Sequence, residues 1–168
     1  MTRVLVAYGS KRGSTAEIAG WIGETLRGQG LETEVADAGT VRDVSAYDAV
    51  VLGGALYAGR WHKDARRFAR RHAAALSGRP VWLFSSGPLD RSAQEGEIPP
   101  VPQAARASAA LDACEHRTFG GRLTHDARGF LASAIAERSG GDYRDQDRVR
   151  DWALRVAAQV AATEQAKS

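Results

Sequence analysis

Short apolar runs alternate with longer segments of helical periodicity along this chain. A parallel strand that is buried on both faces is almost continuously apolar, whereas an edge strand alternates apolar and polar positions. Leu31–Gly39 alternates in this way and predicts an edge strand, and His116–Gly121 predicts a weaker fifth strand. Three runs rich in Val and Leu predict buried strands: Arg3–Gly9, Tyr47–Ala55 and Arg79–Gly87.

Three further segments have apolar residues at helical spacing. The first begins near Ser14 and ends near Gly28 and Gly30, the second is Trp61–Leu76, and the third is Val149–Val160. Strands that alternate with helices imply crossover connections, and therefore a parallel sheet with helices on both faces. We predict an α/β fold of three layers, with a doubly wound parallel sheet of five strands.

The chain has no internal repeat and no interdomain linker, so we predict one domain over residues 1–168. Two segments stand apart from the alternating pattern. Gly87–Gln103 is rich in proline and predicts a surface loop after the fourth strand. Residues 122–147 come before the last helix and predict an insertion, because a plain five-stranded domain does not need this segment.

The composition, with 43% hydrophobic and 26% charged residues, is that of a globular protein. No apolar stretch reaches the length of a membrane span and the first residues do not resemble a signal peptide, so we expect a cytoplasmic protein. The single cysteine, Cys114, permits no internal disulfide, and we expect it to be a small buried residue. Arginine supplies most of the positive charge behind the net charge of +3, and we expect no nucleic-acid partner.

The turn between the first strand and the first helix, Gly9–Thr15, contains the most informative polar cluster in the chain. Successive N–H groups in a glycine-containing turn form an anion-binding nest, and the helix that follows adds its positive N-terminal dipole. Ser10, Ser14 and Thr15 can donate hydroxyl hydrogen bonds to the same anion. The alternative is a helix capped by Ser14, in which Gly13 only turns the chain.

Several phosphate and metal chemistries do not fit this turn. The sequence Arg-Gly-Ser-Thr has no lysine in the P-loop position, and the dinucleotide fingerprint of three glycines is absent. The turn has no carboxylate cluster for magnesium, and Cys114 lies before a strand rather than at the head of an anion loop. No metal-ligand spacing relates the four histidines, so we expect no metal site: His62, His72, His116 and His125.

The pattern Ser-x-x-Gly-x-Thr, formed by Ser10, Gly13 and Thr15, resembles the phosphate loop of the flavodoxins. The segment "VVLGGALYAGRWHKDARRF", Val50–Phe68, resembles the second flavin loop of one branch, the flavodoxin-like protoporphyrinogen oxidases that pass electrons to quinones. In that branch a glycine-rich loop ends in a histidine that opens the next helix. "SGGDYRDQDRVRDWALRVA", Ser139–Ala157, resembles the C-terminal end of the same branch.

This resemblance implies the strand order 2-1-3-4-5 and noncovalently bound FMN, whose ring performs the redox step at its N5 atom. It names no side chain as a catalytic acid or base. An aromatic residue such as Tyr57 or Trp61 would stack on the ring, although Trp61 is equally well interpreted as a core residue. The implied cofactor contacts are Ser10, Lys11, Arg12, Gly13, Ser14 and Thr15 at the phosphate, Ala55, Leu56, Tyr57, Ala58, Gly59 and Trp61 along the ring, and Ser85, Ser86, Gly87 and Pro88 as a third wall.

Three functions follow from the resemblance. The first is an enzyme that oxidises protoporphyrinogen IX or a related organic substrate, with a quinone as acceptor. The second is an electron carrier, although such carriers are strongly acidic and this chain has seven cations and one aspartate between Arg60 and Arg79 that would line one helix. The third is a flavin-free binding or regulatory module, which the glycines of the first two loops argue against.

The basic helix and the inserted segment bear on the partners. A basic face beside a flavin suits a carboxylated substrate or an anionic membrane surface, so peripheral contact with the inner face of a membrane is one expectation. The alternative is an ordinary solvated face. In residues 122–147, Phe130, Leu131, Ala134 and Ile135 predict either a short amphipathic turn or a helix that covers the sheet edge.

Overall fold

The computed structural model describes residues 2–10, 13–57, 60–87, 101–120 and 141–167 of the chain. Strands and helices alternate along it, as the apolar pattern predicts. Their bounds are β1 Arg3–Gly9, α1 Ser14–Gly28, β2 Glu32–Asp37, η1 Ala38–Thr40, β3 Ala49–Tyr57, β4 Arg60–Trp61, α2 Lys63–His72, β5 Val81–Gly87, α3 Pro102–Leu111, β6 Glu115–Gly120 and α5 Gly141–Lys167.

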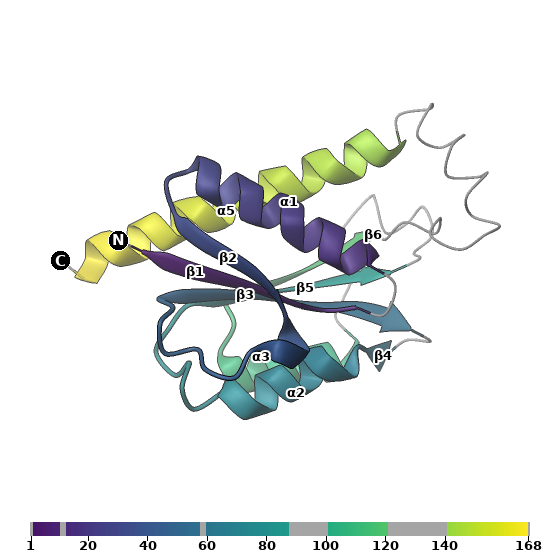
Figure 1. Ribbon diagram of the computed structural model, residues 1–168, viewed down its shortest axis with the longest axis horizontal. Coiled ribbons are helices and arrows are strands. Elements are labelled where there is room, and N and C mark those ends of the chain that lie inside the picture. The colour runs from purple at the N-terminus through teal and green to yellow at the C-terminus, as the bar shows by residue number, and fades with distance from the viewer. Residues whose placement is uncertain (1, 11–12, 58–59, 88–100, 121–140, 168) are drawn as a thin grey trace.

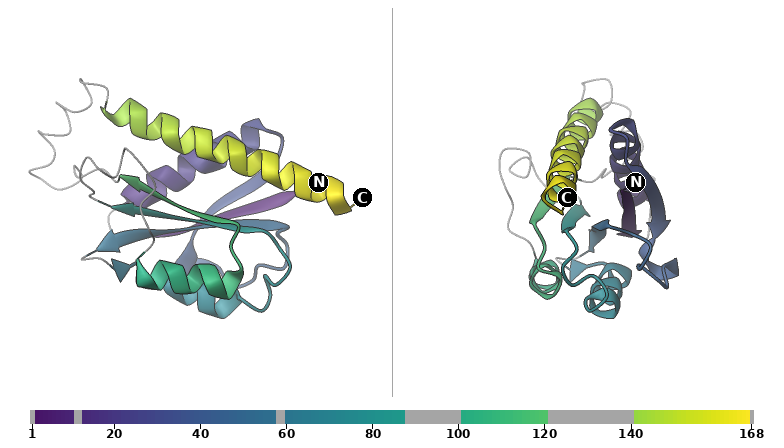
Figure 2. Two further views of the ribbon diagram at one scale, coloured as in Figure 1. Left: turned by 180° about the vertical axis from the view of Figure 1, so that it is seen from behind. Right: turned by 90° about the vertical axis from the view of Figure 1, so that its left-hand side faces the viewer.

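The main sheet has the spatial order β2-β1-β3-β5-β6, and all of its neighbouring strands are parallel. Helices α1 and α5 cover one face of this sheet, and α2 and α3 cover the other (Figures 1 and 2). The predicted three-layer fold and the predicted order 2-1-3-4-5 are therefore confirmed. The two-residue strand β4, which pairs antiparallel with the end of β3, is an addition that the apolar pattern does not predict.

The apolar core lies on both faces of the central strands. In β1, Val4 and Val6 face the α1 and α5 layer, whereas Leu5 and Ala7 face the α2 layer, and none of the four is exposed. This two-sided burial explains why β1 is continuously apolar. The edge strand β2 alternates instead at its start, where Thr33 is buried and Glu32 and Glu34 are exposed.

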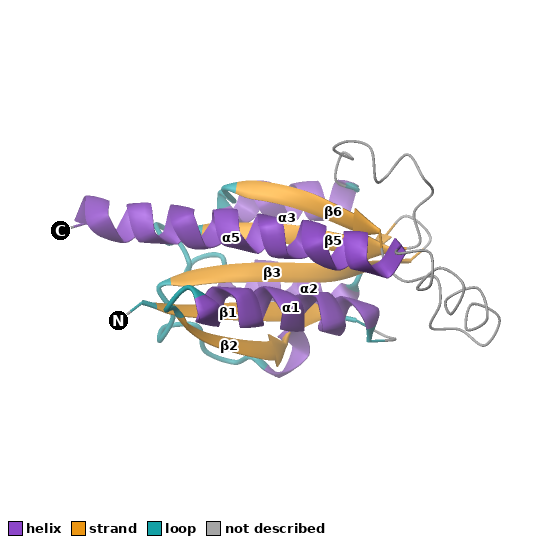
Figure 3. Cartoon of the chain, turned by 90° about the horizontal axis from the view of Figure 1, so that it is seen from above, coloured by secondary structure: helices purple, strands orange, loops and turns teal. Residues whose placement is uncertain are grey.

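Helix α5 lies beside α1 across the same face of the sheet (Figure 3). Trp152 of α5 packs edge-on against Phe84 of β5 and Phe119 of β6, with ring centroids 6.3 and 5.7 Å away. Its indole N–H donates a hydrogen bond of 3.0 Å to the Glu115 carboxylate. These contacts attach the last helix to the last two strands.

Two of the predicted boundaries are wrong. Helix α5 begins at Gly141, so residues 141–147 belong to this helix and not to the predicted insertion over residues 122–147, of which 122–140 lie outside the described residues. The predicted loop Gly87–Gln103 also ends too late, because Pro102 and Gln103 form the first turn of α3. A proline in the first helical turn is a common start signal, since its missing N–H has no partner there in any case.

Of two burial predictions for residues outside the site, the structure contradicts one and confirms the other. Cys114 is exposed, contrary to the prediction that it is buried, because the chain leaves α3 through Asp112 in a left-handed conformation and reaches β6 across the surface. His72 is a core residue, as its place on the apolar stripe predicts, and burial lowers its pKa. No helix in the described ranges is long and apolar enough to span a bilayer.

Candidate functional site

The carboxyl ends of β1, β3 and β5 meet at one edge of the sheet. Gly9 of β1 is level with Gly54 of β3, and Ala55 of β3 is level with Ser86 of β5. The chain order reverses between β1 and β3, and doubly wound sheets bind their ligands beside this switch point. The three segments with predicted cofactor contacts therefore begin at neighbouring positions on this edge.

The loop after β1 contains a serine and a glycine that determine its course. Gly13 has a φ of +88°, a left-handed conformation that glycine adopts without strain. Its N–H donates a hydrogen bond of 3.0 Å to the Ser10 hydroxyl oxygen. Because this hydroxyl accepts one bond, its own proton remains available for a second partner. Lys11 and Arg12, predicted to contact the same phosphate, lie outside the described residues.

The N-terminus of α1 presents three backbone N–H groups, those of Ser14, Thr15 and Ala16. The first ladder bond of the helix is donated by Glu17 to the Gly13 carbonyl at 3.0 Å, and no side chain in the described ranges caps the helix. The alternative in which Ser14 caps α1 is therefore wrong, since Gly13 occupies the cap position. Free N–H groups together with the helix dipole favour an anion at this point.

Thr15 connects the loop after β1 to the end of β5. Its side chain is fully buried, and its hydroxyl lies 2.5 Å from the hydroxyl of Ser86, which is also fully buried. The structure therefore directs the Thr15 side chain to β5. This contact ties the first turn of α1 to the end of the β5 strand, and it determines where the free N–H groups of the helix lie.

The second segment turns back sharply after β3. The N–H of His62 donates a hydrogen bond of 2.9 Å to the Ala55 carbonyl, and β4 pairs with Leu56 and Tyr57. The Leu56 side chain is half-buried and packs with the core on the α2 side. Ala58, Gly59 and the Tyr57 side chain lie outside what the structure describes.

The structure places Trp61 in the core. Its side chain is only 1% exposed and belongs to the apolar cluster under α2 and α3. A ring without an exposed face offers no surface on which a flavin can stack, so the core interpretation is correct and the stacking interpretation is not. Trp61 also lies in β4 and not at the start of the helix, which begins at Lys63.

His62 opens α2, as the resembled oxidases imply. Its Nδ1 accepts a hydrogen bond of 3.1 Å from the Asp64 N–H, which caps the helix. The histidine packs against the end of β1, where a Cβ on Gly9 would lie 2.9 Å from both His62 Nδ1 and the Ala65 nitrogen. Gly9 therefore allows α2 to approach the first loop closely.

A second buried polar pair lies on the α3 side of the same edge. Ser85, predicted as a cofactor contact, is 1% exposed, and its hydroxyl lies 2.7 Å from Nε2 of His116 in β6. Burial lowers the pKa of His116 from 6.5 to about 4, against a smaller upward effect of Glu115, so this imidazole is neutral at pH 7. Gly87 lies beside these residues, and Pro88 is outside the described residues.

Sequence reasoning missed the role of His116, because no spacing rule connects a histidine at the start of a weak strand with a serine 31 residues earlier. Only the register of β5 against β6 brings the two together. Among the described residues, no group of three or more His, Cys, Asp or Glu side chains is placed to hold a metal ion.

Comparisons with known proteins agree with this geometry. A family model described as a flavodoxin domain matches residues 5–136. The protoporphyrinogen IX dehydrogenase [quinone] of Escherichia coli strains K12 and O157:H7 is 27% identical over 85 residues, which cover 49% of this chain and 47% of that protein. The matched part thus spans about half of the relative's length.

Solved structures share the fold at low sequence identity. Oxidised flavodoxin 2 from Bacillus cereus is 20% identical with a TM-score of 0.66, and the match covers 94% of this chain and 99% of that one. A flavodoxin from the domain Archaea is 14% identical with a TM-score of 0.65, over 95% and 99% of the two chains. Rubredoxin oxygen:oxidoreductase from Desulfovibrio gigas is 12% identical with a TM-score of 0.66, over 96% of this chain and 37% of that one.

The hydroxyl pair of Thr15 and Ser86 predicts a strong energetic coupling. Thr15→Val leaves the buried Ser86 hydroxyl without this partner, so we expect the free energy of unfolding to fall by about 1–3 kcal/mol. In the double variant with Ser86→Ala, neither hydroxyl remains to be buried unpaired, and much of that loss should disappear. Urea unfolding of the four proteins measures the coupling. Strictly additive single effects would show that the two hydroxyls do not interact.

The depressed pKa of His116 predicts a pH-dependent stability. Its folded pKa of about 4 lies below the unfolded value of 6.5, so the unfolded chain binds more protons between these two values. The contribution of His116 is complete above pH 6.5 and is lost as the pH falls toward 4, by an amount on the order of 3 kcal/mol. Urea unfolding at several pH values should show that His116→Gln flattens this slope. A variant as steep as the wild type would contradict the assignment.

Proposed function

The chain belongs to the flavodoxin domain family, and we propose that it is an FMN-dependent oxidoreductase that oxidises protoporphyrinogen IX or a related organic substrate, with a quinone as electron acceptor. Members of this family bind flavin. The proposal has two parts, the cofactor and the reaction, and different observations support them.

One observation supports FMN above all: the N–H groups of Ser14, Thr15 and Ala16, which no side chain in the described ranges caps, next to the Ser10 hydroxyl. A phosphate monoester needs several hydrogen-bond donors at one point, and this turn provides them from the backbone at the positive end of a helix. The described part of the turn therefore fits the phosphate of FMN. The ring would then lie along the carboxyl ends of β3 and β5, where Ala55 near the end of β3 and Gly87 at the end of β5 are small residues.

A bound flavin supplies reversible one- and two-electron transfer, and the protein supplies position and surroundings. The Thr15–Ser86 contact holds the helix N-terminus against β5. His116 carries no charge at neutral pH, so the α3 side of this edge gains no positive charge from it. No described side chain is assigned a proton-transfer role.

Two observations support the reaction. The E. coli relative is a protoporphyrinogen IX dehydrogenase [quinone], and the match to it covers about half of each chain. The second observation is charge, because α2 begins beside the candidate flavin site, where His62 packs against Gly9, and carries Lys63, Arg67 and Arg71 on exposed positions. Such a surface suits a carboxylated substrate, whereas a carrier that docks to basic enzymes requires an acidic surface.

Anaerobic turnover tests the reaction. We expect the FMN-loaded protein to convert protoporphyrinogen IX to the fluorescent porphyrin when a quinone such as menadione is present, at a rate proportional to the protein concentration. The same protein without FMN, and the loaded protein without quinone, are the matched controls.

A carrier would behave differently in the same assay. Its porphyrin fluorescence would rise no faster than in the controls, although the bound flavin would still accept electrons from dithionite and pass them to cytochrome c. That outcome would contradict the proposed enzyme and leave the cofactor assignment in place. Protein that takes up no FMN at all would contradict both parts.

A further inference from the structure

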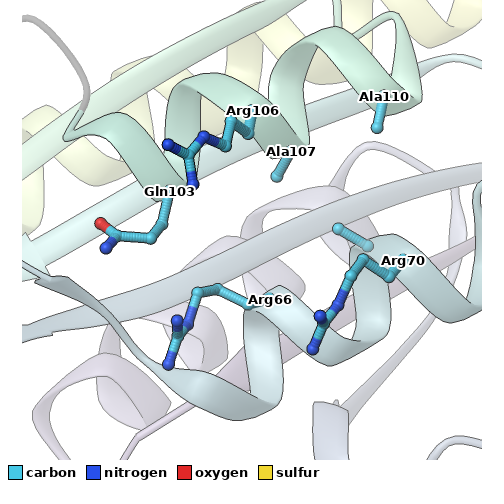
Figure 4. Close-up of a pocket in the computed structure, with 7 residues that line it drawn as sticks. Arg66, Arg70, Gln103, Arg106, Ala107 and Ala110 are labelled. Atoms are coloured by element: carbon cyan, nitrogen blue, oxygen red, sulfur yellow. The ribbon is translucent and has the colours of Figure 1, made fainter.

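A groove of about 240 Å³ lies between α2 and α3, on the face of the sheet opposite α1. Figure 4 shows it from the side, with Arg66 and Arg70 on α2 across from Gln103 and Arg106 on α3. The groove is separate from the candidate phosphate site, which lies at the N-terminus of α1 in the other helical layer. Nothing proposed above assigns it a function.

Three arginines give the groove its charge. Arg66 and Arg70 are one helical turn apart on α2, and Arg106 lies across the groove on α3 (Figure 4). Among the residues that the structure describes, no acidic side chain lines the groove. Within the described part of the chain, no carboxylate forms an ion pair with any of the three guanidinium groups.

The floor of the groove is apolar and shallow. Ala69, Ala107 and Ala110 supply it. A leucine at any of these positions would fill part of the space. The floor can therefore cover the apolar body of a ligand.

Two polar atoms in the groove lining are buried without a hydrogen-bond partner in the described structure. They are the Nε of Arg66, which is a donor, and the amide oxygen of Gln103, which is an acceptor. Rotation of the Gln103 amide by half a turn would present its NH₂ donors at the same point. Buried polar groups in native proteins nearly always have partners, so these two atoms are available to a ligand in the groove.

We propose that this groove binds a small organic dianion, in which two carboxylate groups are joined by a short apolar body. Guanidinium groups bind carboxylates through paired, charge-assisted hydrogen bonds, and three of them can hold two such groups. The apolar body covers the alanine floor. Arg66 and Gln103 would bind one end of the ligand at the first turns of the two helices, and Arg70 and Arg106 would hold the other.

Adipate is a suitable probe, because it joins two carboxylates by four methylene groups. Titrated into the full-length protein and followed by ¹H–¹⁵N NMR, it should shift the amide signals of α2 and α3 in a saturable way. Hexane-1,6-diol has the same chain without the charges and should not bind. Inorganic phosphate has the charge without the apolar body. Its affinity should be lower than that of adipate by about tenfold or more.

Charge variants test the arginines. We expect Arg66→Gln and Arg106→Gln each to weaken adipate binding about tenfold, as the loss of a hydrogen bond to a charged group does. Arg67→Gln is the matched control, because Arg67 is exposed on the same helix, outside the groove, and the variant removes the same charge. Its affinity should change less than about twofold. An equal loss of adipate affinity in all three variants would mean that only the net charge of the protein matters. That result would overturn the proposed site.

A shape variant tests the floor with all charges in place. Ala110→Leu fills the groove from an exposed position, whereas Ala109→Leu adds the same side chain on the neighbouring, non-lining position of α3. Only Ala110→Leu should abolish adipate binding. The proposal is overturned if adipate fails to saturate the wild type, if phosphate binds as tightly as adipate, or if the two leucine variants bind alike.

Discussion

Burial of the central strands on both faces constrains where this protein can place polar chemistry. Along β1, β3 and β5 the side chains pack against helices on either side, and a polar group there would lose its hydration without a partner. Among the described residues of β5, the buried hydroxyl groups lie near the end of the strand, and each has a polar partner. Ser86 meets Thr15 on the α1 side, and Ser85 meets His116 on the α3 side.

These pairs explain how an apolar sheet supports a precise anion site. The Thr15 hydroxyl is used to tie the first turn of α1 to β5, so the free N–H groups of that turn keep a defined position without any cationic side chain among the described residues. In the proposed site the backbone N–H groups would hold the phosphate, and the Thr15 and Ser86 hydroxyls would keep that backbone in place. A site supported by packed elements loses less entropy on binding than one built on a mobile loop.

Periodicity predicts the strands and helices whose apolar pattern is local. It fails where contacts between distant segments determine the position of a residue. The continuous apolar runs of β1, β3 and β5 predicted buried parallel strands correctly. The apolar pattern does not predict helix α3, because only three of its residues are buried and alanines occur on its exposed positions as well. Trp61 was ambiguous because a large aromatic residue suits both a core and a flavin site, and only the β3–β4 turn places it in the core. The pairing of Ser85 with His116 depends on strand register, which no local pattern specifies.

If the N-terminus of α1 holds the phosphate of FMN, the protein must distinguish FMN from riboflavin, and a comparison of the two affinities measures this. The two ligands share the ring and differ in the phosphate. We expect the protein to bind FMN about 10- to 100-fold more tightly than riboflavin, as charge-assisted hydrogen bonds to one group allow. Ser10→Ala should reduce this ratio and leave the riboflavin affinity unchanged. Equal affinities for the two ligands in the wild type would contradict the claim.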